Sequence, residues 1–426
     1  MNKENEHAIA DPRLSFGDGS SHPKMRFAAF ASLKNRDFRW YWFGMLASFN
    51  AMQMQVVARG WLVYTMTNSP LALGLVSAGF GIPMLLFSLY GGAIADRVEK
   101  RNLLLVTRSG MSLVSLIVTI LITTKMIALW HLMLASVLSG AFMSFYMPAR
   151  QAFVMELVGK KTLLNAIAMN SMALNICRIA SPALAGVLIK VIGIPGVYWL
   201  ITISSGLVVF TIWMIPRGKP MSVRANVPLL SDVVDGLRYV RSNSIILALL
   251  LIGIVPILTA MPYQLLMPVF AKTVFKAGET GFGLLMSAVG VGALTGSTLI
   301  ASLGNFQHKG MLSFAVGIVF GICLILFSLS GSLLLAAVFL IFVGGGSSMY
   351  MTLNSTLIMS NTPETLIGRV MSINMMTFGL MPLAMLPAGA LAEIIGAPYT
   401  VCAGGVLLTL FLALVTVFQP RVWRLK

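Results

Sequence analysis

Twelve long apolar runs divide this 426-residue chain, and they constrain its fold more than any other feature. A helix needs about 20 apolar residues to cross the hydrocarbon core of a bilayer. Within that core each backbone polar group must be satisfied inside the protein, so each run predicts a transmembrane helix. The runs lie at about 38–66, 71–95, 103–125, 129–149, 164–192, 195–215, 244–271, 280–303, 310–330, 332–358, 368–395 and 397–418. The sequence therefore predicts an all-α membrane protein.

Composition excludes a soluble enzyme. Hydrophobic residues make up 58% of the chain and charged residues 10%, whereas a soluble domain carries roughly a quarter charged residues. The net charge of +17 raises the question of nucleic acid, but the Lys and Arg residues lie in short segments between apolar runs, as in membrane proteins. We therefore expect a lipid bilayer and no nucleic acid as partner.

The distribution of basic residues predicts the orientation. One set of connections, together with both ends of the chain, holds 24 of the 30 Lys and Arg residues. The opposite connections hold Lys125, Lys190, Lys272 and Lys276, and Arg59 and Arg178 lie within runs. Positive residues stay inside, so both termini are predicted to be cytoplasmic, in a multi-pass protein of the cell (inner or plasma) membrane.

The longest predicted interior connection divides the runs six and six. This predicts a cytoplasmic N-terminal tail at 1–24, a six-helix bundle at 25–215, a linker at 216–243, a second bundle at 244–418 and a C-terminal tail at 419–426. Residues 229–240 of the linker have apolar residues at helical spacing, which indicates an amphipathic helix on the membrane face. A soluble linker helix predicts nearly the same pattern.

The two bundles carry traces of a repeat. At a constant offset of 203, Gly186 matches Gly389, Gly193 matches Gly396, and Pro195 matches Pro398. Gly and Pro constrain the backbone, so their matches carry more weight than matches between leucines. Duplicated six-helix units are common among secondary transporters, whose substrate sites lie between the halves.

Residues 92–101, Gly-Ala-Ile-Ala-Asp-Arg-Val-Glu-Lys-Arg, resemble the cytoplasmic signature of the major facilitator superfamily, G-x-x-x-D-R-x-G-R/K-R/K. Glu99 replaces the usual Gly. The resemblance implies a gate, in which Gly92 allows close helix approach and Asp96 meets a helix N-terminus of the other half. The residues assigned to this cytoplasmic gate are Gly92, Asp96, Arg97, Lys100, Arg101, Arg150 and Arg369.

Further stretches look like the branch that contains enterobactin exporters and macrolide efflux proteins. They are residues 33–39, 61–64, 69–74, 148–152 and 178–186. This branch implies export. Pro182 and Gly186 are expected to kink and pack the fifth helix, although Ser181 stands where antiporters often carry Gly, and Pro262 is expected to bend the seventh.

Polar residues inside the runs are the candidates for a substrate path. Buried arginines suggest either contact with an anionic substrate or hydrogen bonds that hold the bundle together, and both interpretations remain open. Asn170 and Arg178 share a helix face. The full set is Asn50, Gln53, Arg59, Asn170, Asn175, Arg178, Gln264, Asn354 and Asn374.

The sequence says less about the energy source of transport than about the fold. No ATP-binding loop of the form GxxxxGK[ST] is present, so a gradient of protons or another ion is expected to drive transport. No carboxylate lies deep in a run. The candidates for proton coupling are therefore those near the boundaries, Asp37, Asp96, Glu156 and Glu393.

The sequence thus predicts a monomeric, gradient-driven exporter of amphipathic small molecules, drug-like or siderophore-like. An importer or a lysolipid flippase on the same fold is the nearest alternative, and a transport-inactive membrane sensor or assembly factor is a more distant one. Three cysteines and four histidines show no metal spacing, and no acid, base and nucleophile converge. We therefore expect no metal, no cofactor and no enzymatic activity.

Overall fold

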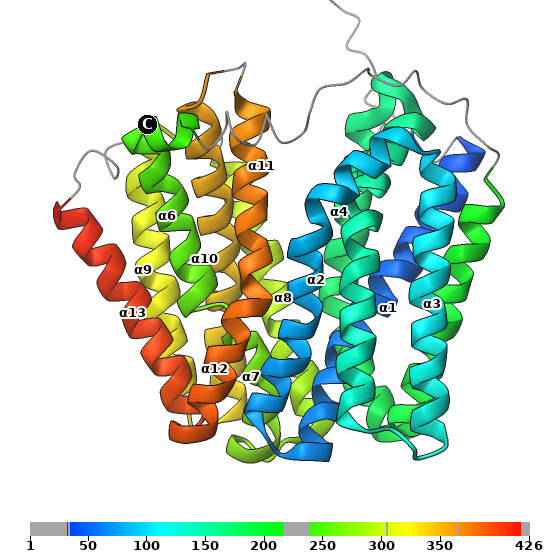
Figure 1. Ribbon diagram of the computed structural model, residues 1–426. Coiled ribbons are helices and arrows are strands. Elements are labelled where there is room, and N and C mark those ends of the chain that lie inside the picture. Colours follow the sequence, from blue (N-terminus) through cyan, green and yellow to red (C-terminus); the bar gives the residue numbers. More distant parts are fainter. Residues whose placement is uncertain (1–31, 33–34, 216–237, 304–305, 364–365, 419–426) are drawn as a thin grey trace, which may run out of the picture.

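The computed structural model describes residues 32, 35–215, 238–303, 306–363 and 366–418, and over these the chain forms helices and no strand. Figure 1 shows two bundles: the N half (α1–α4) at the right, the C half (α6–α13) at the left, with α2 and α8 between them. The all-α membrane fold predicted from the sequence is confirmed. The elements of the N half are α1 (Arg36–Thr67), α2 (Pro70–Arg97), α3 (Lys100–Thr123) and α4 (Leu129–Trp213). Those of the C half are α6 (Ser244–Thr259), α7 (Tyr263–Val269), η2 (Phe270–Val274), α8 (Gly278–Ser302), α9 (Lys309–Ser328), α10 (Leu333–Ser360), α11 (Ile367–Thr377), η3 (Phe378–Leu380), α12 (Met381–Ile395) and α13 (Ala397–Phe418).

The long element α4 consists of three helical segments. Its backbone leaves helical geometry at Gly159 (φ 67°, ψ 174°) and at Gly193 (φ 73°, ψ 172°), conformations that glycine adopts readily. The segments are 129–158, 160–192 and 194–213; the first extends nine residues past the predicted end of the fourth run at 149. Ten stretches of the described residues are long and apolar enough to cross a membrane, and one of them, Asn165–Trp213, contains the break at Gly193. The 32-residue α1 is not among the ten, so the count of twelve spans stays a prediction.

The seventh predicted run is divided in two. α6 ends at Thr259, and α7 begins at Tyr263 directly after Pro262. Proline has no N–H to continue the helical ladder and its ring displaces the preceding turn. The break therefore lies at Pro262, the residue expected to bend this helix, whereas Pro256 and Pro268 lie inside helices.

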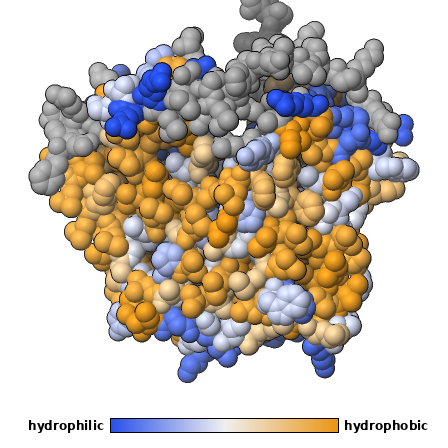
Figure 2. All heavy atoms as spheres, viewed as in Figure 1, coloured by the Kyte–Doolittle hydropathy of each residue, from blue (hydrophilic) through white to orange (hydrophobic). Residues whose placement is uncertain are grey.

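The molecule has two chemically different ends. The basic end, uppermost in Figure 1, carries the connections near residues 98, 159, 243, 303 and 361, and exposes Arg36, Arg39, Arg97 and Arg241. The opposite end, which we call the paired end, carries the tight turns at Asn68, Lys125, Gly193, Lys276 and Gly396. Figure 2 shows a broad hydrophobic belt between hydrophilic ends, the surface that a lipid bilayer covers.

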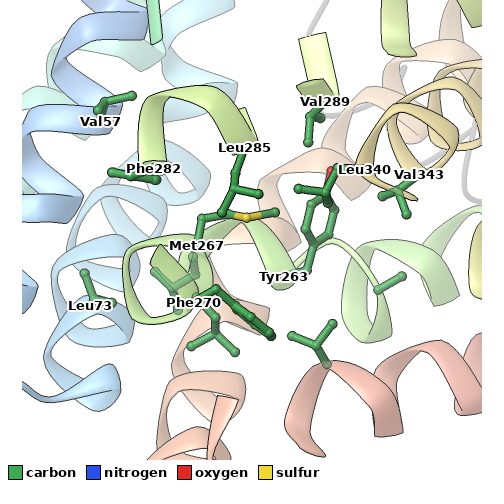
Figure 3. Close-up of a cluster of buried hydrophobic side chains, with 14 of the residues drawn as sticks. Val57, Leu73, Tyr263, Met267, Phe270, Phe282, Leu285, Val289, Leu340 and Val343 are labelled. Carbon is green, nitrogen blue, oxygen red and sulfur yellow. The ribbon is translucent and has the colours of Figure 1, made fainter. Parts of the chain in front are cut away.

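The two halves share one apolar core, in which residues of the two halves meet toward the paired end. Val57 and Leu73 of the N half belong to the same buried cluster as Met267, Phe270 and Leu285 of the C half, as Figure 3 shows. A second buried cluster, which includes Phe38, Tyr146 and Ile212, lies entirely within the N half. The halves are therefore fastened together toward the paired end.

Two glycines at the repeat offset of 203 form matching contacts between the halves. A Cβ atom at Gly186 in α4 would lie 2.5 Å from the carbonyl oxygen of Glu279 at the start of α8. A Cβ atom at Gly389 in α12 would lie 2.6 Å from the carbonyl oxygen of Pro70 at the start of α2. Real Cβ atoms do not approach oxygen this closely. The α4–α8 and α12–α2 contacts, called the glycine seams below, thus depend on the absence of a side chain.

Candidate functional site

A cavity of about 230 Å³ lies between the halves. Arg59 and Ser77 of the N half and Gln264 of the C half supply its polar groups. Gln264 donates from Nε2 to the Tyr263 hydroxyl at 3.5 Å. The rest of the wall is apolar and includes Phe282, Met381 and Met385. A mostly apolar cavity with a few polar groups is typical of sites for small organic molecules.

A second cavity, of about 290 Å³, lies within the N half among α1, α3 and the first and last segments of α4. Three arginines line it: Arg59, Arg108 and Arg150. Val56, Arg59 and Phe80 line both cavities, so the two spaces adjoin along α1. Among the described residues, no Asp or Glu belongs to either lining. Together they make a cationic space.

Each of the three arginines is held by neighbouring elements of the N half. Arg59 donates from Nη1 to Ser136 Oγ at 3.3 Å. Arg108 donates from Nη2 to Ser48 Oγ at 2.7 Å, and its guanidinium lies 5.1 Å from the centre of the Tyr146 ring. Arg150 lies 5.4 Å from the ring of Phe49 and 5.8 Å from that of Tyr146. Cation–π contacts of this kind fix the guanidiniums without neutralising them.

Arg108, Tyr146 and Ser48 were missed by the sequence analysis. Arg108 is one of the 24 basic residues that predict the cytoplasmic side, although it lies five residues inside the third run at 103–125. The available signal was its spacing: eight residues beyond Lys100, at about 1.5 Å per residue, place it roughly 12 Å into the helix. Its exposed fraction is 7%.

The predicted asparagines of the N half line neither of the two cavities that Arg59 lines. Asn170 lines a third cavity, of about 390 Å³, together with Tyr41 and Arg150. The Oδ1 atoms of Asn50 and Asn170 are buried and find no hydrogen-bond partner among the described residues. Gln53 and Asn175, both half-buried, line none of the three cavities.

Arg178 lies at the interface between the halves. The α8 residue Gly290 packs on its carbonyl oxygen. Arg178 lines none of the three cavities. Asn354 and Asn374 are buried within the C half, where Asn374 donates to Ser355 Oγ at 3.5 Å. The structure therefore places Arg59 and Gln264 together and the other predicted residues apart from them.

Two of the predicted gate residues, Lys100 and Arg101, make contacts within the N half. Lys100 forms an ion pair with Glu156 at 2.6 Å. Arg101 donates from Nε to the Ile215 carbonyl at 2.6 Å and from Nη2 to the Trp213 carbonyl at 2.7 Å. It therefore caps the C-terminal end of α4.

The remaining gate residues differ in how closely they are enclosed. Nothing lies within 4 Å of a Cβ atom placed at Gly92, whereas the neighbouring Gly91 packs against Ser144. Arg97 is exposed and Arg369 is half-buried. The side chain of Asp96 lies outside the described part of the structure. The gating role stays a prediction.

At the paired end, Glu393 of the C half forms a latch to the N half. Its Oε2 accepts from Ser69 Oγ at 2.8 Å and from the Leu71 backbone N–H at 3.2 Å. Both donors belong to the start of α2, where a carboxylate is favoured by the helix dipole. Nearby, Lys272 donates to Asn68 Oδ1 at 2.7 Å and lies 5.3 Å from the Tyr64 ring. Of the other coupling candidates, Asp37 lies in the first turn of α1.

Comparison with known families supplies a match over nearly the whole chain. The profile of the family described as "Transmembrane secretion effector" (MFS_3) matches residues 27–425.

Two curated relatives transport siderophores, according to their names. The "Staphyloferrin A transporter" of Staphylococcus aureus (strain NCTC 8325 / PS 47) is 26% identical over 380 residues, which cover 87% of this chain and 93% of that protein. The "Enterobactin exporter EntS" of Citrobacter koseri is 26% identical over 311 residues, covering 72% and 73%.

Solved transporters share the fold at low identity. The nucleoside transporter NupG has a TM-score of 0.72 at 12% identity and covers 90% of this chain and 100% of its own. A bacterial homologue of the human lysosomal transporter Spinster has a TM-score of 0.68 at 15% identity and covers 92% and 98%.

Proposed function

The chain belongs to the family of transmembrane secretion effectors, in the major facilitator superfamily, and we propose that it exports amphipathic anions of the siderophore class by alternating access. The names of the two curated relatives support this cargo and, for one of them, this direction.

The observation that carries the proposal is the charge of the cavity. Arg59 faces the space between the halves, and no carboxylate of the described part of the chain lines that space or the adjoining one. A lipophilic cation there would meet repulsion from Arg59. An anion with an apolar body would pair with the guanidinium while Phe282, Met381 and Met385 contact the remainder.

The described state is open toward the cytoplasm in this proposal. The basic end faces the cytoplasm by the positive-inside rule. The shared core, the glycine seams and the Glu393 latch all close the opposite, paired end. A substrate would enter from the basic end, and separation of the halves at the paired end would release it outside.

A gradient of protons is the proposed energy source. Glu393 is the described carboxylate that joins the two halves, through Ser69 and Leu71. Protonation from outside would remove the negative charge from the start of α2 and weaken the latch. Lys272 and Tyr64 are the other titratable groups of that contact region.

The test is transport by the full chain in liposomes with an imposed pH gradient. We expect uptake of a catecholate anion and no uptake of a lipophilic cation, and Arg59→Gln should lower anion transport. Arg39→Gln, which removes an exposed arginine of the same helix, serves as the control and should transport like the unaltered protein. Gradient-dependent transport of the cation, with the anion ignored, would overturn the proposed cargo and indicate a drug exporter.

A further inference from the structure

The cavity within the N half, which we call the N-half cavity, adjoins the space between the halves but is lined by a different set of helices. Its walls come from α1, α2, α3 and α4, and no residue of the C half lines it. A transporter that used the inter-half cavity alone would have no need of a cationic space inside one bundle. The cavity also requires an explanation because buried charge without a counter-charge is costly.

Arg108 is the central group of this cavity. It is 93% buried, and its Nε is an enclosed donor without a hydrogen-bond partner among the described residues. A guanidinium has five N–H donors in a fixed plane, and the hydrogen bond found for Arg108 goes to the Ser48 hydroxyl. The guanidinium therefore has hydrogen-bonding capacity left beyond Ser48, and the side chain lines the cavity.

Arg101 shows what a structural arginine looks like on the same helix. It lies two turns from Arg108 and is buried to a similar degree, with 9% exposed. Its Nε and Nη2 both donate to backbone carbonyls at the end of α4, and it lines none of the three cavities. Arg108 has no such carbonyl partners among the described residues. A purely structural role therefore explains the burial of Arg108 less well than that of Arg101.

No counter-charge is available from the surrounding chain. The sequence has no Asp or Glu between Asp37 and Asp96, between Glu99 and Glu156, or between Glu156 and Asp232. These intervals contain α1 beyond its first turn, the whole of α3 and all of α4 except Glu156. The charges of Arg59, Arg108 and Arg150 can be balanced locally by an anion that enters from outside the protein.

The aromatic residues indicate the shape of that anion. Both Arg108 and Arg150 lie against the Tyr146 ring, and Arg150 also lies against Phe49. Planar guanidiniums recognise planar carboxylates with two parallel hydrogen bonds, and they stack on aromatic faces. A flat aryl group that carries a negative charge matches both properties.

We propose that the N-half cavity binds the planar anionic head of the transported molecule, an aryl carboxylate or catecholate, and that Arg108 is its principal ligand. In taking the ligand to be the transported molecule, this inference rests on the proposed function. Because the two cavities share Arg59, the head group can pass from Arg150 and Arg108 to Arg59 as it approaches the space between the halves.

The first experiment measures binding of 2,3-dihydroxybenzoate to the purified full chain in nanodiscs by calorimetry, with the neutral 2,3-dihydroxybenzamide as a second probe. We expect Arg108→Gln to weaken binding of the acid about ten- to hundredfold, as loss of a charge-assisted hydrogen bond does. The amide should bind weakly to both proteins. Arg39→Gln should bind like the unaltered protein. Equal affinity of the Arg108→Gln and unaltered proteins for the acid would overturn the proposal.

A second measurement locates the ligand without altering an arginine. Met143 lines the N-half cavity and not the inter-half cavity, so Met143→Cys places a thiol there, in a Cys402→Ser background. The acid should slow labelling of this thiol by a methanethiosulfonate reagent. Unchanged labelling at a saturating concentration of the acid would overturn the proposed location, even if Arg108→Gln fails to fold.

The outcomes separate this inference from the proposed function. If the protein transports a catecholate anion and Arg108→Gln transports it equally well, the function stands and the inference is wrong. If the acid binds and protects Met143→Cys but no anion is transported, the binding site stands and the export proposal is wrong.

Discussion

At the scale of single residues, Arg101 and Arg108 of α3 illustrate how the hydrogen-bond partners of a side chain determine its role. Both belong to the basic segment that predicts cytoplasmic orientation, and sequence alone treats them alike. Arg101 donates to two carbonyls at the end of α4, whereas Arg108 retains an unpartnered donor beside a cavity of the described structure. Burial is nearly the same for both, so hydrogen bonding distinguishes them.

The structure predicts that Arg101→Ala lowers the stability of the protein. The change leaves the Trp213 and Ile215 carbonyls without their donor, which costs about 1–3 kcal/mol. Thermal unfolding in detergent measures the effect. Arg97→Ala, at an exposed position of the same motif, is the matched control and should change stability by no more than about 0.5 kcal/mol. Equal effects of the two substitutions would contradict the capping role.

At the scale of elements, the apolar pattern predicted helices well and their internal breaks less well. The predicted runs begin and end within a few residues of most helices, because about 20 apolar residues are a strong signal. The first segment of α4 is the main exception, since it continues to residue 158 through the Arg150 region before Gly159 turns the chain. The bend at Pro262 follows from proline chemistry, but Pro182 stays inside a regular helix. Whether a proline kinks its helix also depends on the neighbouring helices, which the local sequence does not show.

The candidate site was harder to predict than the helices. Arg59 and Gln264 were selected as polar residues inside the predicted runs, and the structure places both in the lining of one cavity. The sequence did not indicate which helices would enclose Arg108, since that depends on how α1, α3 and α4 pack. Contacts between distant segments, such as Ser48 with Arg108, leave no local pattern in the sequence.

The latch between α12 and α2 yields a prediction at this scale. Glu393→Gln keeps an acceptor near Ser69 but removes the charge that the start of α2 favours. We expect the paired end to open more often. In a Cys402→Ser background, the distance between spin labels at Met126→Cys and Ser332→Cys, exposed positions in opposite halves, should gain a longer component. Acidification should produce a similar change in the protein with Glu393 and little in the variant. A distance distribution unaffected by Glu393→Gln would contradict the latch.

At the scale of the whole molecule, the fold is two bundles joined at one end. The contacts between the halves in the shared core, the glycine seams and the latch all lie toward the paired end. Alternating access requires this junction to separate and the basic end to close. The relative free energy of the two states therefore depends on contacts that individual substitutions can change.

The seams give the corresponding prediction. A methyl group at Gly186 would collide with the Glu279 carbonyl, so Gly186→Ala should destabilise the described state by about 1–3 kcal/mol. This corresponds to a shift of about five- to 150-fold in the ratio of the two states. The same pair of spin labels reports it. Gly206→Ala is the control, because nothing lies within 4 Å of a Cβ atom at that position. If Gly186→Ala left the distance distribution unchanged, α8 would have to shift locally to make room for the methyl group, and the halves would not separate.

The glycine seams also bear on the ancestry of the fold. Gly186 and Gly389 stand at equivalent positions of the two repeats and make equivalent contacts. In a two-fold symmetric homodimer, one residue forms both copies of an interface contact, so a single ancestral glycine accounts for the pair. The position equivalent to Glu393 is Lys190, so one seam acquired an acidic neighbour and the other a basic one.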